Sequence, residues 1–440
     1  MKNRFHITSA VLLILSLTFF WGCEEEQPSF PNQYNTGLAK TQGTIEQVTI
    51  NSLYVGEAKT ANIYLPAGYD PTADKTYPVV YMLHGIFSDE DYWLQTYYLK
   101  ELADQLIADG KIQPMIMVMP NARNAMGGSF YTNSVDIDPN RNPMMNPALG
   151  FGLYEYYLIQ EVIPTVEAQY KIDPDRRAIQ GKSMGGYGAI KLALLYPTMF
   201  KSIAAHSGPL AFDALIFSEG SNLLPRLAME QVDSLGNPLP IIDLAAAVAD
   251  PARHVLTLMS FGLASAFSPH FGPAGTYDSY LLSIGYPGIN SSKVYQYMVS
   301  STPIDTAGPG PVDDIYPGVD LPFRIAQPGV TADTVTESYT KFLMHDCYTM
   351  LATGKAPDQT DLDIDSFKKL NLYIDCGIQD DTNPGDDGMG LNIIPTNDAF
   401  HELLNQMGIE HRYERYTGDH MSDVYYRVEI GLKEHDKVFK

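Results

Sequence analysis

Short apolar segments alternate with segments of helical periodicity along most of this chain. The first two apolar segments, residues 61–65 and 79–83, are rich in β-branched and aromatic residues, and Gly or Pro follows each of them. Leucine, isoleucine and alanine then recur at helical spacing over residues 99–107, and Gly110 stands where a C-cap is expected. Strands that alternate with helices form a mostly parallel sheet with helices on both faces. The sequence therefore predicts an α/β fold.

The alternation continues on both sides of a long interruption. Further strands are expected at 115–119, 177–180, 202–205, 370–376 and 410–416, and further helices at 154–170 (kinked or divided at Pro164), 189–195, 400–407 and 422–437. Between residues 209 and 365 the alternation stops, and a Pro- and Gly-dense segment occupies 302–322. A structureless loop of this length is improbable in a compact domain. We interpret 209–365 as an inserted cap or lid, with helical pieces near 243–248 and from 334 onward.

The N-terminal residues have the pattern of an export signal. Lys2 and Arg4 precede an apolar run over residues 10–21, which is shorter than the roughly 20 residues of a transmembrane helix. Gly22-Cys23 resembles the end of a lipobox, in which the cysteine is lipidated, although Phe20 stands where such motifs usually carry Leu. An ordinary secretory signal cut near Gly22 is the alternative.

These features divide the chain into a signal peptide at 1–22, a lipidated Cys23 with a tether to residue 45, and one domain at 46–440. The acidic run at residues 24–26 resembles the surface-export signal of some bacterial lipoproteins, and a solvated linker is the alternative. We expect an exported, lipid-anchored protein at the outer membrane or surface of a Gram-negative bacterium.

Charge and cysteine content exclude two classes of protein. Asp and Glu total 52 against 29 Lys and Arg, which gives a formal net charge of −23. Such an acidic surface repels phosphate backbones, so nucleic-acid binding is not expected. Three cysteines are too few for a disulfide scaffold. If Cys23 is acylated, the sequence leaves open whether Cys347 and Cys376 pair.

A G-x-S-x-G motif, Gly181-Lys182-Ser183-Met184-Gly185, lies between a predicted strand and a predicted helix. The glycines permit a tight turn that lifts the Ser183 hydroxyl above the sheet, and the helix N-terminus supplies free N–H groups. The Met184 amide is then one donor to an oxyanion. The second donor of such a fold comes from the loop after an earlier strand, which here places it at Ile86, after His84-Gly85.

An activated serine needs a base, and the base needs an orienting carboxylate. In this fold they follow the serine in the order acid, then histidine. His420 follows the strand that ends near residue 416 and is the candidate base. Asp380 and Asp381 both follow the strand at 370–376 and are candidate acids. Asp375 lies inside that strand and is expected to point elsewhere.

Several segments together resemble one family of α/β-hydrolase esterases. They are YLPAGY (64–69), YPVVYMLHGIFSDEDYW (77–93) and IQGKSMGGYGAIKLALLYPTMF (179–200). The family includes esterase D, the mycolyltransferases, and the feruloyl and acetylxylan esterases of carbohydrate esterase family one. LYIDCGIQDD (372–381) and YTGDH (416–420) are similar to bacterial feruloyl esterase domains. The resemblance covers roughly 46–208 and 366–440 and leaves the insertion out.

The resemblance implies that Ser183 is the nucleophile and His420 the base, with Ile86 and Met184 as oxyanion donors. It favours Asp380 over Asp381 as the acid, because the family's acid stands three residues beyond the glycine that is Gly377 here.

Trp93 matches a family aromatic residue that lines the acyl pocket, and core packing explains it equally well. No cofactor or metal is expected: the segment at 136–140 starts like a calcium loop but lacks the glycine and glutamate of one.

The expected protein is thus a secreted serine esterase that acts through an acyl-serine intermediate on acetyl or feruloyl esters of polysaccharide. An acyltransferase of the same fold is one alternative. A surface glycan-binding lipoprotein with a vestigial hydrolase fold is another. The export signal disfavours a cytosolic thioester hydrolase.

Overall fold

The computed structural model describes residues 42–124, 126–134, 152–217, 223, 229–230, 250, 253–270, 318–319, 339–380 and 391–440. Several sequence-based predictions lie outside these residues. They are the signal peptide at 1–22, Cys23 and the tether as far as residue 41, the calcium-like loop, the helical piece near 243–248, the beginning of the piece at 334, and Asp381. Among the helices of the described part, none is long and apolar enough to cross a membrane.

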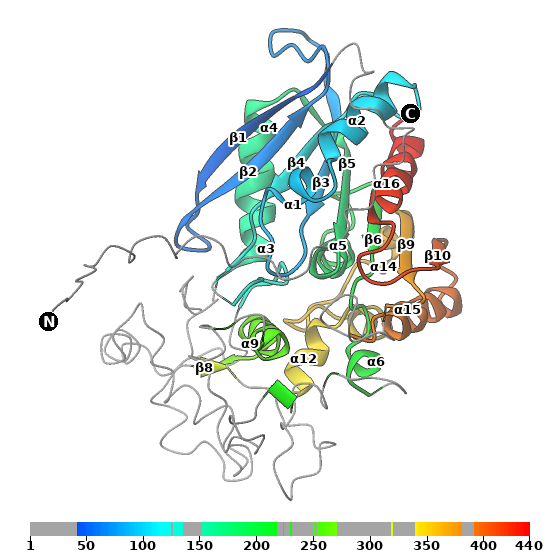
Figure 1. Ribbon diagram of the computed structural model, residues 1–440. Coiled ribbons are helices and arrows are strands. Elements are labelled where there is room, and N and C mark those ends of the chain that lie inside the picture. The colour runs from blue at the N-terminus through cyan, green and yellow to red at the C-terminus, as the bar shows by residue number, and fades with distance from the viewer. Residues whose placement is uncertain are drawn as a thin grey trace, which may run out of the picture.

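Eight strands form one sheet in the order β1-β2-β4-β3-β5-β6-β9-β10 (Figure 1). They are β1 (Thr44–Asn51), β2 (Ala58–Leu65), β3 (Tyr77–Leu83), β4 (Ile116–Pro120), β5 (Ile172–Lys182), β6 (Ser202–His206), β9 (Asn371–Gly377) and β10 (Arg412–Tyr416). β2 is antiparallel to both β1 and β4, whereas every pair from β4 to β10 is parallel. The carboxyl ends of the parallel strands therefore meet at one edge of the sheet.

Helices cover both faces of this sheet. They are α1 (Tyr92–Gln95), α2 (Leu99–Ala108), α3 (Tyr154–Tyr156), a π-helix (Tyr157–Val162), α4 (Ile163–Gln169), α5 (Met184–Leu195), α15 (Ile394–Gln406) and α16 (Val424–Phe439). Alternate residues of β3 point to opposite faces of the sheet and so contact different helices. Val80 and Met82 pack with residues of α2 and α16, while Val79 and Tyr81 pack with residues of α4, α5 and α15. The predicted α/β fold class is confirmed.

Two local features differ from the prediction. The helix expected at 154–170 contains a π-helical turn over Tyr157–Val162 directly before α4, and Pro164 lies at the start of α4, where the sequence predicts a kink or boundary. Strand β1 was not predicted, because most of its side chains are exposed and its sequence, TIEQVTIN, has little apolar content.

Between β6 and β9 the described residues add no strand to the main sheet. They form α6 (Phe212–Phe217), α9 (Val255–Phe267), α12 (Tyr339–His345), α13 (Cys347–Thr353), α14 (Ile364–Phe367) and a separate pair of two-residue strands, β7 (Pro269–His270) and β8 (Gly318–Val319). Phe267 of α9 lies 5.7 Å from Tyr187 of α5, measured between ring centroids, and 5.3 Å from Phe212. This part of the 209–365 segment therefore packs on the helix that begins after Ser183. Cys347 and Cys376 are both free and buried.

Candidate active site

Ser183 forms the turn between β5 and α5 in a strained backbone conformation. Its φ is 56° and its ψ is −120°, which a non-glycine residue adopts only when the surroundings enforce it. Its backbone N–H donates to the carbonyl of His206, at 2.8 Å. A Cβ on Gly185 would overlap the carbonyl of Leu83, so only glycine lets α5 start this close to β3. The structure thus has the sharp turn that the motif predicts, with Ser183 at the carboxyl edge of the sheet.

Asp380 and His420 lie together, although 40 residues separate them in the sequence. The turns that follow β9 and β10 are in contact, since a Cβ on Gly377 would overlap the carbonyl of Gly418. His420 Nδ1 lies 3.0 Å from one carboxylate oxygen of Asp380 and 2.9 Å from the other. Asp380 is fully buried and His420 is 2% exposed. Because the Nδ1–H donates to the carboxylate, Nε2 is the ring nitrogen that can accept a proton.

The nucleophile turn and the histidine loop meet at the same edge. Lys182, which precedes Ser183, places its Nζ 3.2 Å from the sulfur of Met421, which follows His420. The immediate chain neighbours of Ser183 and His420 are therefore in contact. The structure thus places Ser183 at the same sheet edge as the hydrogen-bonded Asp380–His420 pair.

The two proposed oxyanion donors flank Ser183. A Cβ on Gly85 would lie 3.6 Å from Ser183 Cβ, which puts the loop that carries Ile86 directly beside the nucleophile. The side chains of Ile86 and Met184 both contact Gly128, so the two residues are neighbours in space. Met184 is the first residue of α5, and amides in the first turn of a helix have no partner within that helix. The structure therefore places the two residues whose amides are the expected oxyanion donors beside Ser183.

His84 is a structural residue. Its Nδ1 donates to the carbonyl of Gly85 at 2.7 Å, and its Nε2 accepts from the backbone N–H of Ala122 at 2.9 Å. Burial lowers the pKa of His84 to about 4. Both ring nitrogens are occupied in the neutral form, so His84 does not compete with His420 as a base.

Trp93 is buried in the core rather than placed beside the nucleophile. Its side chain is 0% exposed and packs between α2 and the sheet. The neighbouring Tyr92 is only partly buried, and its hydroxyl lies 3.8 Å from the position of a Cβ on Gly85. Tyr92 is therefore an aromatic residue next to the Ser183 turn. Sequence reasoning missed it because two consecutive aromatic residues do not show which one α1 turns inward.

A second buried Asp–His pair lies close to the first. His206 Nδ1 donates to Asp375 at 2.8 Å, and Arg427 donates to the same carboxylate oxygen at 3.1 Å. Burial would raise the pKa of Asp375, but His206 and Arg427 together hold it below its usual value. Gln180 Nε2 donates to the remaining nitrogen of His206 at 3.0 Å. The Asp375 carboxylate is thus held by His206 and Arg427, and both nitrogens of His206 are in use.

His435 extends this buried network and makes stability depend on pH. Its Nδ1 accepts from the Ser202 hydroxyl at 2.8 Å, its Nε2 donates to Gln180 at 3.1 Å, and burial beside His206 lowers its pKa to about 3. An unfolded histidine titrates near pH 6.5, so below that pH only the unfolded chain binds this proton. The contribution of His435 is therefore present above pH 6.5 and is lost as the pH falls towards 3.

We expect the free energy of unfolding of the wild type to fall more steeply with acid than that of His435→Gln. Between about pH 7 and pH 5, the wild type is expected to lose about 2 kcal/mol more of its free energy of unfolding than His435→Gln, at roughly 1.4 kcal/mol per pH unit. Urea denaturation at the two pH values measures it, with His401→Gln, a partly exposed histidine, as the control. Equal acid sensitivity in the wild type and His435→Gln would contradict the assignment.

The described ranges hold no cluster of three or more His, Cys, Asp or Glu side chains arranged to bind a metal ion. A serine hydroxyl, a histidine fixed by a carboxylate and two amides are the parts of a site that forms and resolves an acyl-serine.

Comparisons with known proteins agree on the type of domain. Residues 52–231 match the model of a family described as "Putative esterase". An endo-1,4-beta-xylanase/feruloyl esterase of Xylanibacter ruminicola is 35% identical over 163 residues, which are 36% of this chain and 20% of that protein. An esterase of Mycobacterium tuberculosis is 34% identical over 157 residues, 35% of this chain and 30% of its own. The chain thus matches less than a third of the length of each of these relatives.

A solved structure of a ferulic acid esterase is similar in fold. The alignment covers 91% of this chain and 100% of the other, with a TM-score of 0.50 and 17% sequence identity. At this level of identity the likeness concerns the fold, which is that of the α/β-hydrolases.

Proposed function

We propose that the protein is a serine esterase acting through an acyl-serine intermediate, and the match of residues 52–231 to the esterase family model supports this proposal. The observation that carries the proposal is the strained turn at Ser183, at the same sheet edge as the hydrogen-bonded Asp380–His420 pair. Unlike His206, whose two ring nitrogens are both in use, His420 bonds to Asp380 through Nδ1 and keeps Nε2 to take a proton.

Each group has one role in the proposed reaction. His420 Nε2 takes the proton from the Ser183 hydroxyl as its oxygen attacks the ester carbonyl carbon. Asp380 stabilises the imidazolium that forms, and the Ile86 and Met184 amides stabilise the negative oxygen of the tetrahedral intermediate. The alcohol leaves with the proton from His420. Water then attacks the acyl-serine, and the same groups release the acid and restore Ser183.

The substrate class we propose is acetyl or feruloyl esters on polysaccharide. Two of the similar proteins are named as feruloyl or ferulic acid esterases, and one of them also as a xylanase. The partly exposed Tyr92 beside the Ser183 turn offers an aromatic contact to an acyl group. We also propose export with a lipid on Cys23, since the residues before it have the pattern of a signal peptide. Incorporation of labelled palmitate that is lost in Cys23→Ser tests this location.

A panel of esters tests the proposed substrate class. We expect the protein to hydrolyse p-nitrophenyl acetate and to release acid from either methyl ferulate or acetylated xylan, with lower turnover of long-chain p-nitrophenyl esters. Released acid is measured by chromatography, in parallel with reactions that contain an added sugar or alcohol acceptor. New esters on the acceptor without hydrolysis would replace the esterase by an acyltransferase. Absence of turnover on the whole panel by a folded protein would favour a glycan-binding protein.

A further inference from the structure

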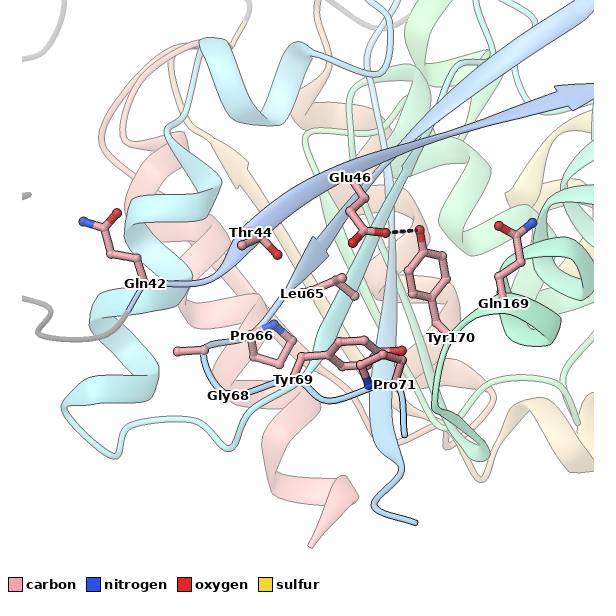
Figure 2. A pocket seen from close by; sticks show the side chains of 11 residues that line it. Gln42, Thr44, Glu46, Leu65, Pro66, Gly68, Tyr69, Pro71, Gln169 and Tyr170 are labelled. Atoms are coloured by element: carbon pink, nitrogen blue, oxygen red, sulfur yellow. Dashed lines mark hydrogen bonds between the residues drawn. The ribbon is translucent and has the colours of Figure 1, made fainter. Parts of the chain in front are cut away.

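A pocket of about 400 Å³ opens at the opposite edge of the sheet from Ser183 (Figure 2). Three segments that are distant in sequence build it: the start of β1, the end of β2 with the turn after it, and the end of α4. Its lining residues are Gln42, Thr44, Glu46, Leu65, Pro66, Ala67, Gly68, Tyr69, Pro71, Gln169 and Tyr170. The volume is within the range of small-molecule sites.

The pocket is separate from the proposed catalytic site. β2 runs antiparallel to β4, so Leu65 at its end lies at the edge where the parallel strands begin. Tyr77, the first residue of β3, has its ring 5.5 Å from that of Tyr69 in the pocket, and Leu83 at the other end of β3 is in contact with the Ser183 turn. At about 3.3 Å per residue, β3 separates the two sites by roughly 20 Å.

Two tyrosine rings form a wall that hydrogen bonds hold in place. The hydroxyl of Tyr170 donates to Glu46 at 2.9 Å, and the hydroxyl of Tyr69 accepts from the backbone N–H of Lys171 at 3.1 Å. The two ring centroids are 6.3 Å apart. Figure 2 shows Glu46 and Tyr170 joined by their hydrogen bond, with Tyr69 next to Tyr170. Side chains that are fixed before a ligand arrives lose little conformational entropy when it binds.

The polar groups of the lining select the kind of ligand. Gln42, Thr44 and Gln169 are neutral, solvent-exposed side chains that donate and accept hydrogen bonds, and Glu46 adds one carboxylate. Among the described residues that line the pocket none is Lys or Arg, although Lys100 stands beside it with its Nζ 3.5 Å from Gln42 Oε1. The lining itself therefore favours a neutral ligand over a phosphate or another anion. A quaternary ammonium ion would leave the amides and the hydroxyl unused. A sugar uses both the aromatic wall and the polar side chains, because its C–H face packs on an aromatic ring and its hydroxyl groups bond to amides and carboxylates.

We propose that this pocket is a second carbohydrate site, which binds a segment of the polysaccharide whose esters are hydrolysed at Ser183. The choice of polysaccharide rests on the proposed function, whereas the sugar chemistry rests on the pocket. Binding of one polymer chain at a site some 20 Å from the nucleophile raises the concentration of its esters near Ser183. The pocket takes no part in the reaction of a small soluble ester.

Ester-free xylohexaose tests the pocket independently of catalysis. In calorimetric titration we expect the wild-type protein to bind it and Tyr170→Ala to bind it about tenfold more weakly or not at all. Gln169→Ala, a change at an exposed side chain, is expected to weaken binding without a cost in folding. Tyr170→Phe keeps the ring and loses only the hydroxyl that bonds to Glu46, so it is expected to retain most of the affinity. Tyr156→Ala, a tyrosine outside the pocket with 40% exposure, is the control.

The same variants separate the pocket from the proposed activity. We expect Tyr170→Ala to raise KM for acetylated xylan while kcat, and turnover of p-nitrophenyl acetate, stay at wild-type values. Absence of xylohexaose binding, or equal binding by the wild type, Tyr170→Ala and Gln169→Ala, would overturn the carbohydrate site. Pocket-dependent binding of choline in place of xylohexaose would overturn it as well. Xylohexaose binding that depends on Tyr170 in a protein without ester turnover would refute the proposed function and keep the pocket.

Discussion

Ser183→Ala is expected to lower kcat for p-nitrophenyl acetate by on the order of 10⁴- to 10⁶-fold. The reason is that the proposed reaction takes its attacking oxygen from the Ser183 hydroxyl, which lies on the strained turn before α5. Without its hydroxyl, no acyl-enzyme forms, and only the oxyanion amides and substrate binding remain to assist direct attack by water.

The fold is expected to survive this substitution, because alanine keeps the Cβ and the Ser183 backbone N–H still donates to His206. Steady-state kinetics and thermal unfolding of the same samples separate loss of chemistry from loss of structure. Ser265→Ala is the matched control, since Ser265 is a buried serine whose hydroxyl bonds within α9, to Gly262. Turnover by Ser183→Ala near the wild-type rate would remove Ser183 from the mechanism.

Much of the fold and the candidate site could be predicted because local patterns determine them. The apolar strands β3 and β4 have side chains buried on both faces, so they stand out as short apolar segments. The motif around Ser183 determines a local backbone turn, and the glycines that permit this turn are close to Ser183 in the sequence. His420 could be selected by its order along the chain. The preference for Asp380 over Asp381 came from a family resemblance, and the hydrogen bonds to His420 agree with it.

The features that escaped prediction depend on contacts between distant segments. The packing of α1 against α2 and the sheet determines that Trp93 points into the core. The same packing leaves Tyr92 on the side of the Ser183 turn. The Asp375–His206–Arg427 network joins β9, β6 and α16, and no local sequence pattern indicates it. The pocket at Tyr69 and Tyr170 arises only when the end of α4 meets the turn after β2. The sequences of the described helices within 209–365 carry no pattern that indicates their packing on α5.

The two buried Asp–His pairs give the sharpest test of the assigned roles, because they have similar geometry and different expected functions. His420 bonds to Asp380 and leaves Nε2 available, whereas His206 bonds to Asp375 and uses its other nitrogen for Gln180. Only the first pair can pass a proton from a serine to a leaving group. The second pair also holds the guanidinium of Arg427, so its carboxylate neutralises a buried charge.

Asp380→Asn is therefore expected to lower kcat by about 10⁴-fold, since an amide in that place no longer stabilises the imidazolium and favours the wrong tautomer of His420. Asp375→Asn is expected to leave kcat of the folded protein near the wild-type value and to lower the free energy of unfolding by about 3 kcal/mol, because it leaves Arg427 incompletely paired in the core. Kinetics on samples shown to be folded, and urea denaturation of both variants, measure the two effects. A kinetic loss in Asp375→Asn as large as that in Asp380→Asn would mean that His206 also handles the proton. Wild-type kinetics in Asp380→Asn would require another carboxylate to orient His420.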